Sequence, residues 1–159
     1  TRWASLYRAY STLSNNMKNT IDRLVGTFSY QARAGEVVKT DDNHDRVRRI
    51  RETPDVKHPL VNVNPATGRK ALYIDPGTLI GIDGMPQDEA DSLLDELLVH
   101  TVQPDNVYEH DWQVGDLVLW DNAVVLHARD AFPNEENRLV KRMIIKLDQT
   151  QYIIPSATE

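Results

Sequence analysis

The sequence predicts a mainly β protein with flanking helices, and three observations carry this prediction. Short apolar runs in the second half of the chain are separated by turn signals rich in glycine, proline or Asp-Asn. One longer segment, residues 86–100, has the apolar spacing of a helix. The 159 residues, 40% apolar and 26% charged, suit one globular domain or part of one. This pattern favours an antiparallel sandwich or barrel with a helix packed outside it.

The first third of the chain predicts helices followed by a loop. Residues 4–13 have helix-compatible apolar spacing, and Ser14 is a suitable cap for a second helix over about 15–25. From about residue 31 to 55 the pattern dissolves into polar and charged residues. We expect a long polar loop or lid there.

The remaining elements are mostly strands. Residues 58–63 and 70–74 flank a Pro/Gly turn and predict a hairpin. Pro86 and the acidic residues after it favour the start of the helix over 86–100. Further strands are expected at 107–112, 116–120, 123–127 and 139–147.

Charge and composition exclude several classes of function. A net charge of −6 gives no electrostatic footprint for nucleic acid or an anionic membrane. The absence of cysteine excludes disulfides and thiolate metal sites. No apolar run approaches the roughly 18 residues of a membrane span, and no signal peptide is visible. We expect a cytoplasmic protein without nucleic-acid or membrane partners, for which a homo-oligomer stays open.

A histidine and two arginines form the candidate site. His127 ends an apolar run, and a lone histidine there favours a core or rim residue bonded to a backbone carbonyl. Arg138 and Arg142 follow on the next strand-like segment, and their even spacing puts them on one face. Inward guanidinium groups need anions, and arginine suits carboxylates. The spacing supports two interpretations equally. One is a pocket for a metal and small organic anions, and the other is a pair of arginines bonded to acidic residues at the rim.

Ordered motifs add a resemblance to a known family. Residues 112–127, "WQVGDLVLWDNAVVLH", followed by Arg138 and Arg142, resemble the C-terminal signature of the taurine dioxygenase / 2,4-dichlorophenoxyacetate dioxygenase (TauD/TfdA) family. These are Fe(II)- and 2-oxoglutarate-dependent oxygenases. "HPLV" at 58–61, "PATGRKALYI" at 65–74 and "TRWASLYRAYSTL" at 1–13 match in order. The resemblance implies a double-stranded β-helix (jelly-roll) core.

The resemblance also implies residue roles. In the family, two histidines and a carboxylate hold the iron, and His127 matches the second histidine. Arg138 and Thr1 match the residues that bind the distal carboxylate of 2-oxoglutarate. Arg142 matches the arginine that binds the acidic group of the substrate. Thr78 falls where the taurine enzyme places an aromatic residue against its substrate.

One family motif is missing from these residues. The other two iron ligands belong to an H-x-D/E motif before the block that begins at Thr1, and none of the five histidines starts such a motif. We therefore expect residues 1–159 to be the C-terminal part of a single oxygenase domain, apparently incomplete at the N-terminus. Such a segment alone should bind iron poorly and not turn over. A degenerate protein that has lost catalysis is the alternative.

The implied reaction couples 2-oxoglutarate and O₂ to the oxidation of a small organic anion. 2-Oxoglutarate gives succinate and CO₂ while a sulfonate, sulfate ester, aryloxyalkanoate or other carboxylate is hydroxylated. Desaturation, oxidative decarboxylation or halogenation on the same iron centre are alternatives. A non-catalytic module that binds 2-oxoglutarate or another anion is the alternative from a different class.

The other histidines have structural interpretations. His58 is expected to be structural in the hairpin. His100 ends the long helix, where a carbonyl contact is natural. His110 and Asp111 are expected to form a surface pair.

Overall fold

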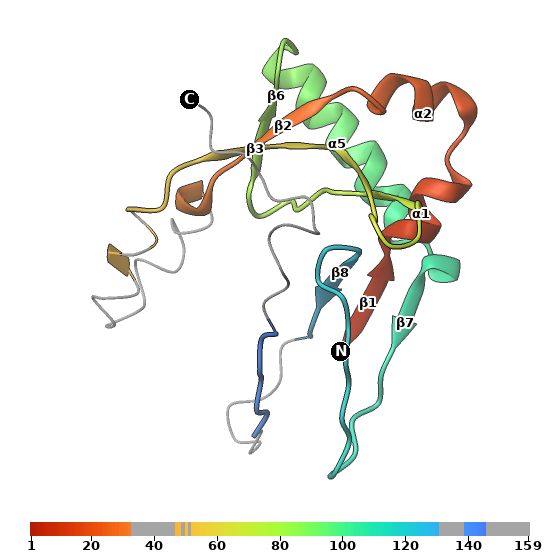
Figure 1. Cartoon of the computed structure of the whole chain (residues 1–159), viewed down its shortest axis with the longest axis vertical. Coiled ribbons are helices and arrows are strands. Elements are labelled where there is room, and N and C mark those ends of the chain that lie inside the picture. The colour runs from red at the N-terminus through yellow and green to blue at the C-terminus, as the bar shows by residue number, and fades with distance from the viewer. Residues whose placement is uncertain (33–46, 49, 51, 131–138, 146–159) are drawn as a thin grey trace.

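The computed structural model describes residues 1–32, 47, 48, 50, 52–130 and 139–145. Figure 1 shows strands arranged in small antiparallel sheets, and the helices α1 and α5 pack against strands of these sheets. The predicted combination of sheets and flanking helices is confirmed at this level. The strands are β1 (Arg2–Ser5), β2 (Val25–Phe28), β3 (Val56–Pro59), β4 (Val61–Val63), β5 (Lys70–Leu72), β6 (Leu79–Ile82), β7 (Val107–Glu109) and β8 (Val125–Ala128).

One sheet joins the first strand of the chain to two strands far along it. Its order is β7-β1-β8, with β1 antiparallel to both neighbours (Figure 1). Trp3 lies opposite Tyr108 on one side and His127 on the other. These non-local pairings fix which residues of the three strands share a face.

The predicted hairpin exists, but it is shorter than expected. β4 and β5 pair antiparallel, whereas β3 joins β2 and β6 in a separate sheet. The chain changes sheets at Leu60, which is fully buried. Its N–H donates to the Leu24 carbonyl at 3.0 Å, and its own carbonyl accepts from the Tyr73 N–H at 2.7 Å. Leu60 thus satisfies its backbone groups on both sheets.

Three helices have clear beginnings in the sequence. They are α1 (Leu6–Thr12), α2 (Asn15–Ile21) and α5 (Gln87–Thr101). Ser5 and Ser14 cap the first two by accepting from the N–H three residues on. The prediction of a helix over 4–13 is wrong at residues 4 and 5, which pair in β1, and the second helix ends before the predicted residue 25. The helix predicted over 86–100 is confirmed within one residue at each end.

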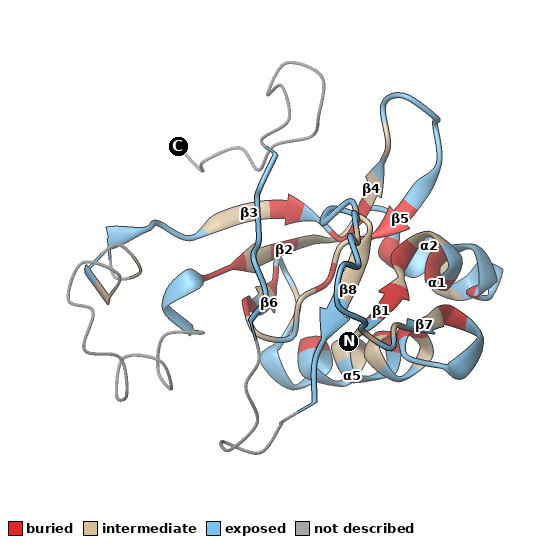
Figure 2. Cartoon of the chain, turned by 90° about the horizontal axis from the view of Figure 1, so that it is seen from below, coloured by how far each residue is buried: buried red, intermediate tan, exposed pale blue. Residues whose placement is uncertain are grey.

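The core lies between these helices and the sheets. α1 packs against β5, and α5 packs against β6. Figure 2 shows the buried residues gathered where β1, β4 and β5 meet α1. The largest fully buried apolar side chains are Ile21, Leu60, Leu72 and Leu97. Within the part of the chain described, no helix is long and apolar enough to cross a membrane.

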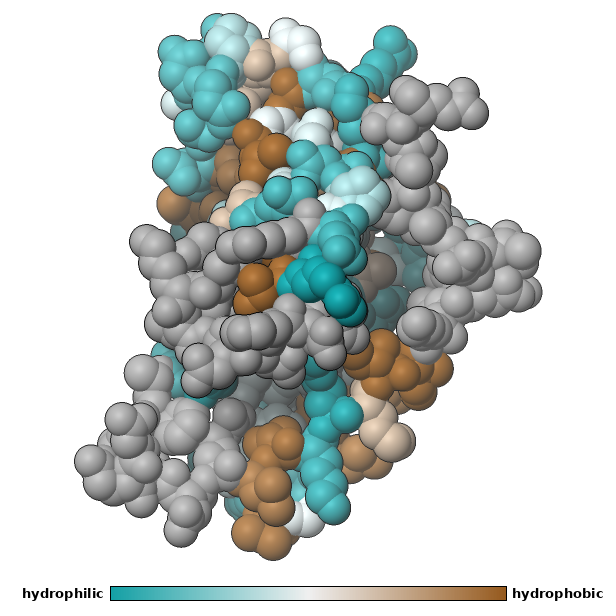
Figure 3. All heavy atoms as spheres, turned by 90° about the vertical axis from the view of Figure 1, so that its left-hand side faces the viewer, coloured by the Kyte–Doolittle hydropathy of each residue, from teal (hydrophilic) through white to brown (hydrophobic). Residues whose placement is uncertain are grey.

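Two segments predicted as strands are not strands here. Residues 116–120, and the described part of the last predicted strand, 139–145, are in no ladder. Apolar spheres gather on the lower half of the molecule in Figure 3. Without a ladder or a covering helix among the described residues, the large apolar side chains of these segments stay exposed. They include Leu117, Leu119, Leu139, Met143, Ile144 and Ile145.

His58 is a buried structural residue as expected, but it lies in β3 and not in the hairpin β4–β5. Its burial gives a pH prediction. Its side chain is 1% exposed and stacks on the Tyr73 ring, with 4.1 Å between ring centroids. Burial lowers the pKa of His58 below its ordinary value, against the smaller opposing effect of the Pro59 carbonyl. The unfolded chain therefore binds more protons below about pH 6.5. The stability that the neutral ring contributes is present above that pH and is lost as the pH falls through the folded-state pKa.

We expect the free energy of unfolding, measured with urea in the full-length protein, to fall between about pH 6.5 and 5. His58→Phe should flatten this part of the profile because the ring no longer titrates. His100→Gln is the matched control, and it should keep the slope. An unchanged slope in His58→Phe would contradict the assignment to His58.

Candidate functional site

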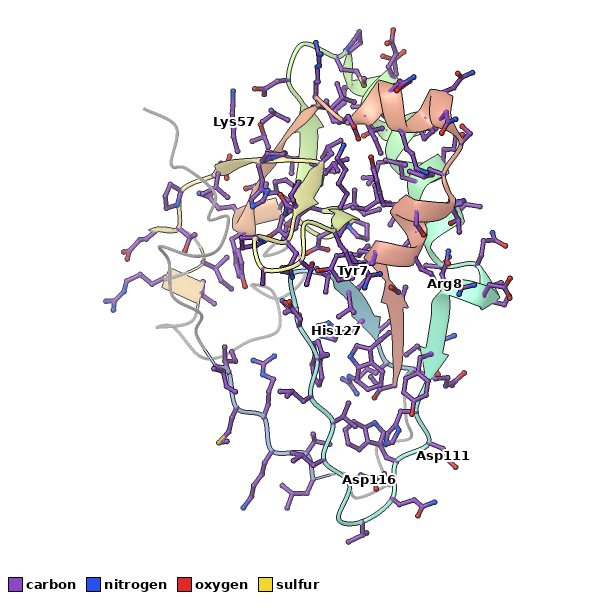
Figure 4. All side chains as sticks on the ribbon, turned by 45° about the vertical axis from the view of Figure 1, so that its right-hand side comes forward. Tyr7, Arg8, Lys57, Asp111, Asp116 and His127 are labelled. Carbon is purple, nitrogen blue, oxygen red and sulfur yellow. The ribbon has the colours of Figure 1, made fainter. Side chains whose placement is uncertain are left out.

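The sheet β7-β1-β8 brings two of the predicted site residues to one face. Side chains alternate along a strand, and directly opposite residues of neighbouring strands point to the same side. Thr1 and Trp3 therefore share a face, and His127 shares it because it lies opposite Trp3. Thr1 and His127 flank Trp3 on this face, which we call the Trp3 face. Figure 4 shows His127 on β8, next to β1.

Aromatic rings cover the Trp3 face. Trp3 is 6% exposed, and the rings around it have centroids 5.3–6.4 Å away. The Trp3 indole N–H is buried and has no hydrogen-bond partner among the described residues. We call these packed rings the aromatic floor of the site. The rings around Trp3 belong to Tyr108, His110, Trp112 and Trp120.

Thr1 is held by both its backbone and its hydroxyl. Its carbonyl accepts from the His110 N–H at 2.8 Å, which extends the β1–β7 pairing by one residue. Its Oγ1 accepts from the Trp112 indole N–H at 2.8 Å. Thr1 is half-buried. The predicted carboxylate-binding hydroxyl therefore has a fixed place at the end of β1.

The segment after β7 is ordered around Asp116. The expected His110–Asp111 pair is wrong, because His110 Nε2 contacts Asp116 Oδ2 at 2.9 Å. The Gln113 N–H donates to the same oxygen at 2.9 Å. This N–H, followed by His110, lowers the pKa of Asp116, so the carboxylate stays charged at neutral pH. This carboxylate and the bond from the Asp116 N–H to the Gln113 carbonyl close the turn that follows Trp112.

His127 is exposed, not a core histidine. The Trp120 ring lies beside it, with 5.5 Å between centroids. Within the ranges described, neither imidazole nitrogen has a hydrogen-bond partner, so the expected carbonyl contact is absent there. An imidazole with both nitrogens open fits the requirement for a metal ligand.

No contact between described residues brings the other predicted site residues to the Trp3 face. Thr78 precedes β6 in the second sheet, is 8% exposed, and donates from its hydroxyl to Asp75 Oδ2 at 3.1 Å. Arg142 is exposed and lies in no strand. Arg138 lies outside the described residues. Most of the predicted loop or lid, about 31–55, also lies outside them.

The described residues fit one ligand of a metal, not a complete set. Among them, no group of three or more histidine, aspartate or glutamate side chains could hold an ion. His127 offers an imidazole nitrogen, which suits Fe(II). Thr1 offers a hydroxyl, which suits a carboxylate. The described residues therefore do not form a complete metal site by themselves.

A protein-family comparison places the chain. The model of the family described as "Taurine catabolism dioxygenase TauD, TfdA family" matches residues 1–144. The chain belongs to this family. The predicted resemblance is thereby confirmed, and the match includes the blocks that contain Thr1, His127, Arg138 and Arg142.

Curated relatives in this family are dioxygenases and an alkylsulfatase. The chain is 32% identical over 143 residues to (S)-phenoxypropionate/alpha-ketoglutarate-dioxygenase of Sphingobium herbicidovorans, covering 88% of the chain and 50% of the relative. It is 33% identical over 142 residues to alpha-ketoglutarate-dependent 2,4-dichlorophenoxyacetate dioxygenase of a Burkholderia species, covering 89% and 46%. It is 27% identical over 151 residues to an alkylsulfatase of Acinetobacter baylyi, covering 91% and 47%. The chain spans about half the length of each.

Solved structures agree with the family. AAD-2 in complex with Mn(II) and N-oxalylglycine superposes with a TM-score of 0.65 and is 31% identical, covering 78% of this chain and 48% of that one. A taurine dioxygenase from Burkholderia xenovorans has a TM-score of 0.61 and is 28% identical, covering 78% and 38%. The chain thus shares its fold with a part of each of these solved structures.

Sequence reasoning missed three residues of the Trp3 face. Trp3 precedes the helix predicted over 4–13 and was given no role. His110 was expected in a surface pair, and Trp112 was only the last residue of the strand predicted over 107–112. The alternation Tyr108-His110-Trp112 was the available signal, because it puts three rings on one side of a strand. Its meaning depended on the pairing with β1.

Proposed function

We propose that the protein is an Fe(II)- and 2-oxoglutarate-dependent dioxygenase that oxidises a small organic anion. The observation that carries the proposal is the pairing of β1 with β8 in a TauD/TfdA chain. It puts Thr1 and His127 on one face, on either side of Trp3. The proposal includes a jelly-roll core in which residues 1–159 are the C-terminal part of a single domain. The length of the relatives supports this, since the chain spans about half of each.

Each site residue has a proposed role. His127 would supply one imidazole ligand to the iron, and two further ligands would come from outside these residues. Thr1 and Arg138 would bind the distal carboxylate of 2-oxoglutarate, and Arg142 would bind the acidic group of the substrate. When bound, Fe(II) supplies the activation of O₂ that couples decarboxylation of 2-oxoglutarate to oxidation of a substrate carbon. The aromatic floor around Trp3 would exclude water from the site.

The substrate class follows from the relatives and from Arg142. Two relatives are named as dioxygenases of phenoxypropionate and 2,4-dichlorophenoxyacetate, and a third is named as an alkylsulfatase. The guanidinium group of an arginine can donate two hydrogen bonds to a carboxylate, and a sulfonate or sulfate offers similarly placed oxygens. We therefore propose a sulfonate, sulfate ester, aryloxyalkanoate or other carboxylate. Thr78 would serve the substrate only if its hydroxyl left Asp75.

The test is succinate release. The full-length protein, loaded anaerobically with Fe(II), is given 2-oxoglutarate, O₂ and a panel of aryloxyalkanoates, alkyl sulfonates and alkyl sulfates. Succinate should rise above the background with one class of anion, and the product should carry one added oxygen. Desaturated, decarboxylated or halogenated product would indicate the alternative outcomes on the same iron. Binding of 2-oxoglutarate with no succinate above background would favour the non-catalytic module.

Arg138→Ala should raise the 2-oxoglutarate concentration needed for half-maximal succinate release by about 10- to 100-fold. Hydrogen bonds to charged groups contribute roughly 1.5–3 kcal/mol, and about 1.4 kcal/mol corresponds to tenfold. Arg8→Ala is the matched control, because Arg8 is an exposed arginine on α1 (Figure 4). Unchanged saturation in Arg138→Ala would remove Arg138 from the 2-oxoglutarate site.

A further inference from the structure

The contact between Trp112 and Thr1 restricts what the Thr1 hydroxyl can do. A threonine hydroxyl has one proton to donate and two lone pairs that accept, whereas an indole N–H only donates. The 2.8 Å contact from Trp112 Nε1 therefore makes Thr1 Oγ1 the acceptor. The hydroxyl proton must then point elsewhere, and no acceptor for it is found among the described residues. The Thr1 hydroxyl can therefore donate its proton to a bound ligand.

The direction of the Trp112 indole is itself fixed. The His110 ring meets the Trp112 ring edge to face, with 4.7 Å between centroids. His110 is held at both ring nitrogens, by the Tyr108 hydroxyl at 3.0 Å and by Asp116 at 2.9 Å. Asp116 also accepts from the Gln113 N–H, next along the chain from Trp112. The turn after β7 thus holds Trp112 in place from its ring and from its backbone.

The backbone of Thr1 is held by β7, so only its side chain can still rotate. The Thr1 carbonyl accepts from the His110 N–H at 2.8 Å, so β7 already fixes the main chain. A free hydroxyl would still rotate among three staggered positions. The bond from Trp112 selects among them, and ligand binding then no longer has to order this group.

We propose that Trp112 is a positioning residue that presents the Thr1 hydroxyl as a hydrogen-bond donor to an anionic ligand. The inference rests on the proposed function, under which that ligand is the distal carboxylate of 2-oxoglutarate. Trp112 does not touch the ligand; it acts through Thr1. A carboxylate accepts and cannot donate, so a hydroxyl held in the donor state favours it over a neutral carboxylic acid or an amine.

The test measures the Kd of 2-oxoglutarate by anaerobic calorimetry with the Fe(II)-loaded full-length protein. Trp112→Phe keeps a ring but removes the N–H, and it should raise this Kd about 3- to 10-fold, as expected for one neutral hydrogen bond. Thr1→Val should raise it at least as much. In the Thr1→Val background, Trp112→Phe should add less than about twofold, because the acceptor is already gone. The KM of the anionic substrate should not change.

Two further variants separate positioning from packing. Tyr7→Phe removes a hydroxyl from an aromatic side chain on α1, outside the Trp3 face, and should leave the Kd within about twofold. If Trp112→Phe lowers the Tm, the benzothiophene analogue of tryptophan is placed at position 112 instead. It keeps the shape of the indole and lacks the N–H, so it should reproduce the rise in Kd at an unchanged Tm.

The outcomes are distinct. An unchanged Kd in both position-112 variants, with a raised Kd in Thr1→Val, overturns the role of Trp112 and leaves the proposed function standing. Equal effects of Trp112→Phe with and without the Thr1 hydroxyl also overturn it, since the ring would then act through packing. Failure of the unsubstituted protein to bind 2-oxoglutarate overturns the proposed function, and this inference with it.

Discussion

His127→Ala is expected to abolish 2-oxoglutarate turnover while leaving the fold intact. Loss of groups that only orient a metal ligand typically costs 10- to 100-fold in affinity or activity, so loss of the ligand itself should cost at least about 100-fold. His127 is exposed, and substitution of an exposed residue usually changes stability by less than about 0.5 kcal/mol. Turnover should therefore fall without a change in Tm.

The measurement is the iron content after anaerobic loading, alongside succinate release and thermal unfolding of the full-length protein. His100→Gln is the control, because His100 contacts the Ala9 carbonyl and the Thr12 hydroxyl, away from β8. It should retain iron and turnover. Should His127→Ala keep its iron and its turnover, His127 would not be a ligand. A large fall in Tm with turnover retained would instead restore the structural interpretation of this histidine.

Local signals predicted helices better than strands. The helix over 86–100 is found almost as expected because its start, its apolar stripe and its end are all encoded within one segment. Ser14 caps α2 as expected for the same reason. Residues 2–5 have no such local signature as a strand, since their partners lie more than 100 residues away at 107–109 and 125–128. Pairing with distant strands overrides the weak helical spacing of residues 4 and 5.

The residues of the candidate site could be proposed from the sequence, but their arrangement in space could not. The motif around His127 and the block that begins at Thr1 can each be recognised separately in the sequence. That the two lie on one face depends on the register of β1 against β8, which no single strand encodes. The same limit explains the His110–Asp111 error. Neighbours in sequence suggested a pair, but a closed turn brings His110 to Asp116.

Among glycine-to-alanine substitutions in the β3-β2-β6 sheet, Gly26→Ala is expected to lower the stability most. A Cβ at Gly26 would lie 2.5 Å from Leu79 Cδ1 and 2.9 Å from Leu60 Cδ2. Leu60 is fully buried, and its backbone is bonded to both Leu24 and Tyr73, so it has little room to move. Overpacking of this kind costs typically 1–3 kcal/mol, and two close contacts place it near the top of that range. A loss of about 3 kcal/mol should lower the Tm by roughly 6–12 °C.

Gly81→Ala is the matched control on the adjacent strand. A Cβ there would meet only the Gln87 side chain, at an ordinary 3.6 Å, and alanine restricts the unfolded chain more than glycine does. Its Tm should stay level or rise slightly in thermal unfolding of the full-length protein. Because Gly26 and Gly81 lie on paired strands, a general intolerance of alanine in this sheet would lower both Tm values. Equal losses would therefore contradict the packing argument, and a loss confined to Gly26→Ala would locate the tightest contact of the core at Leu60 and Leu79.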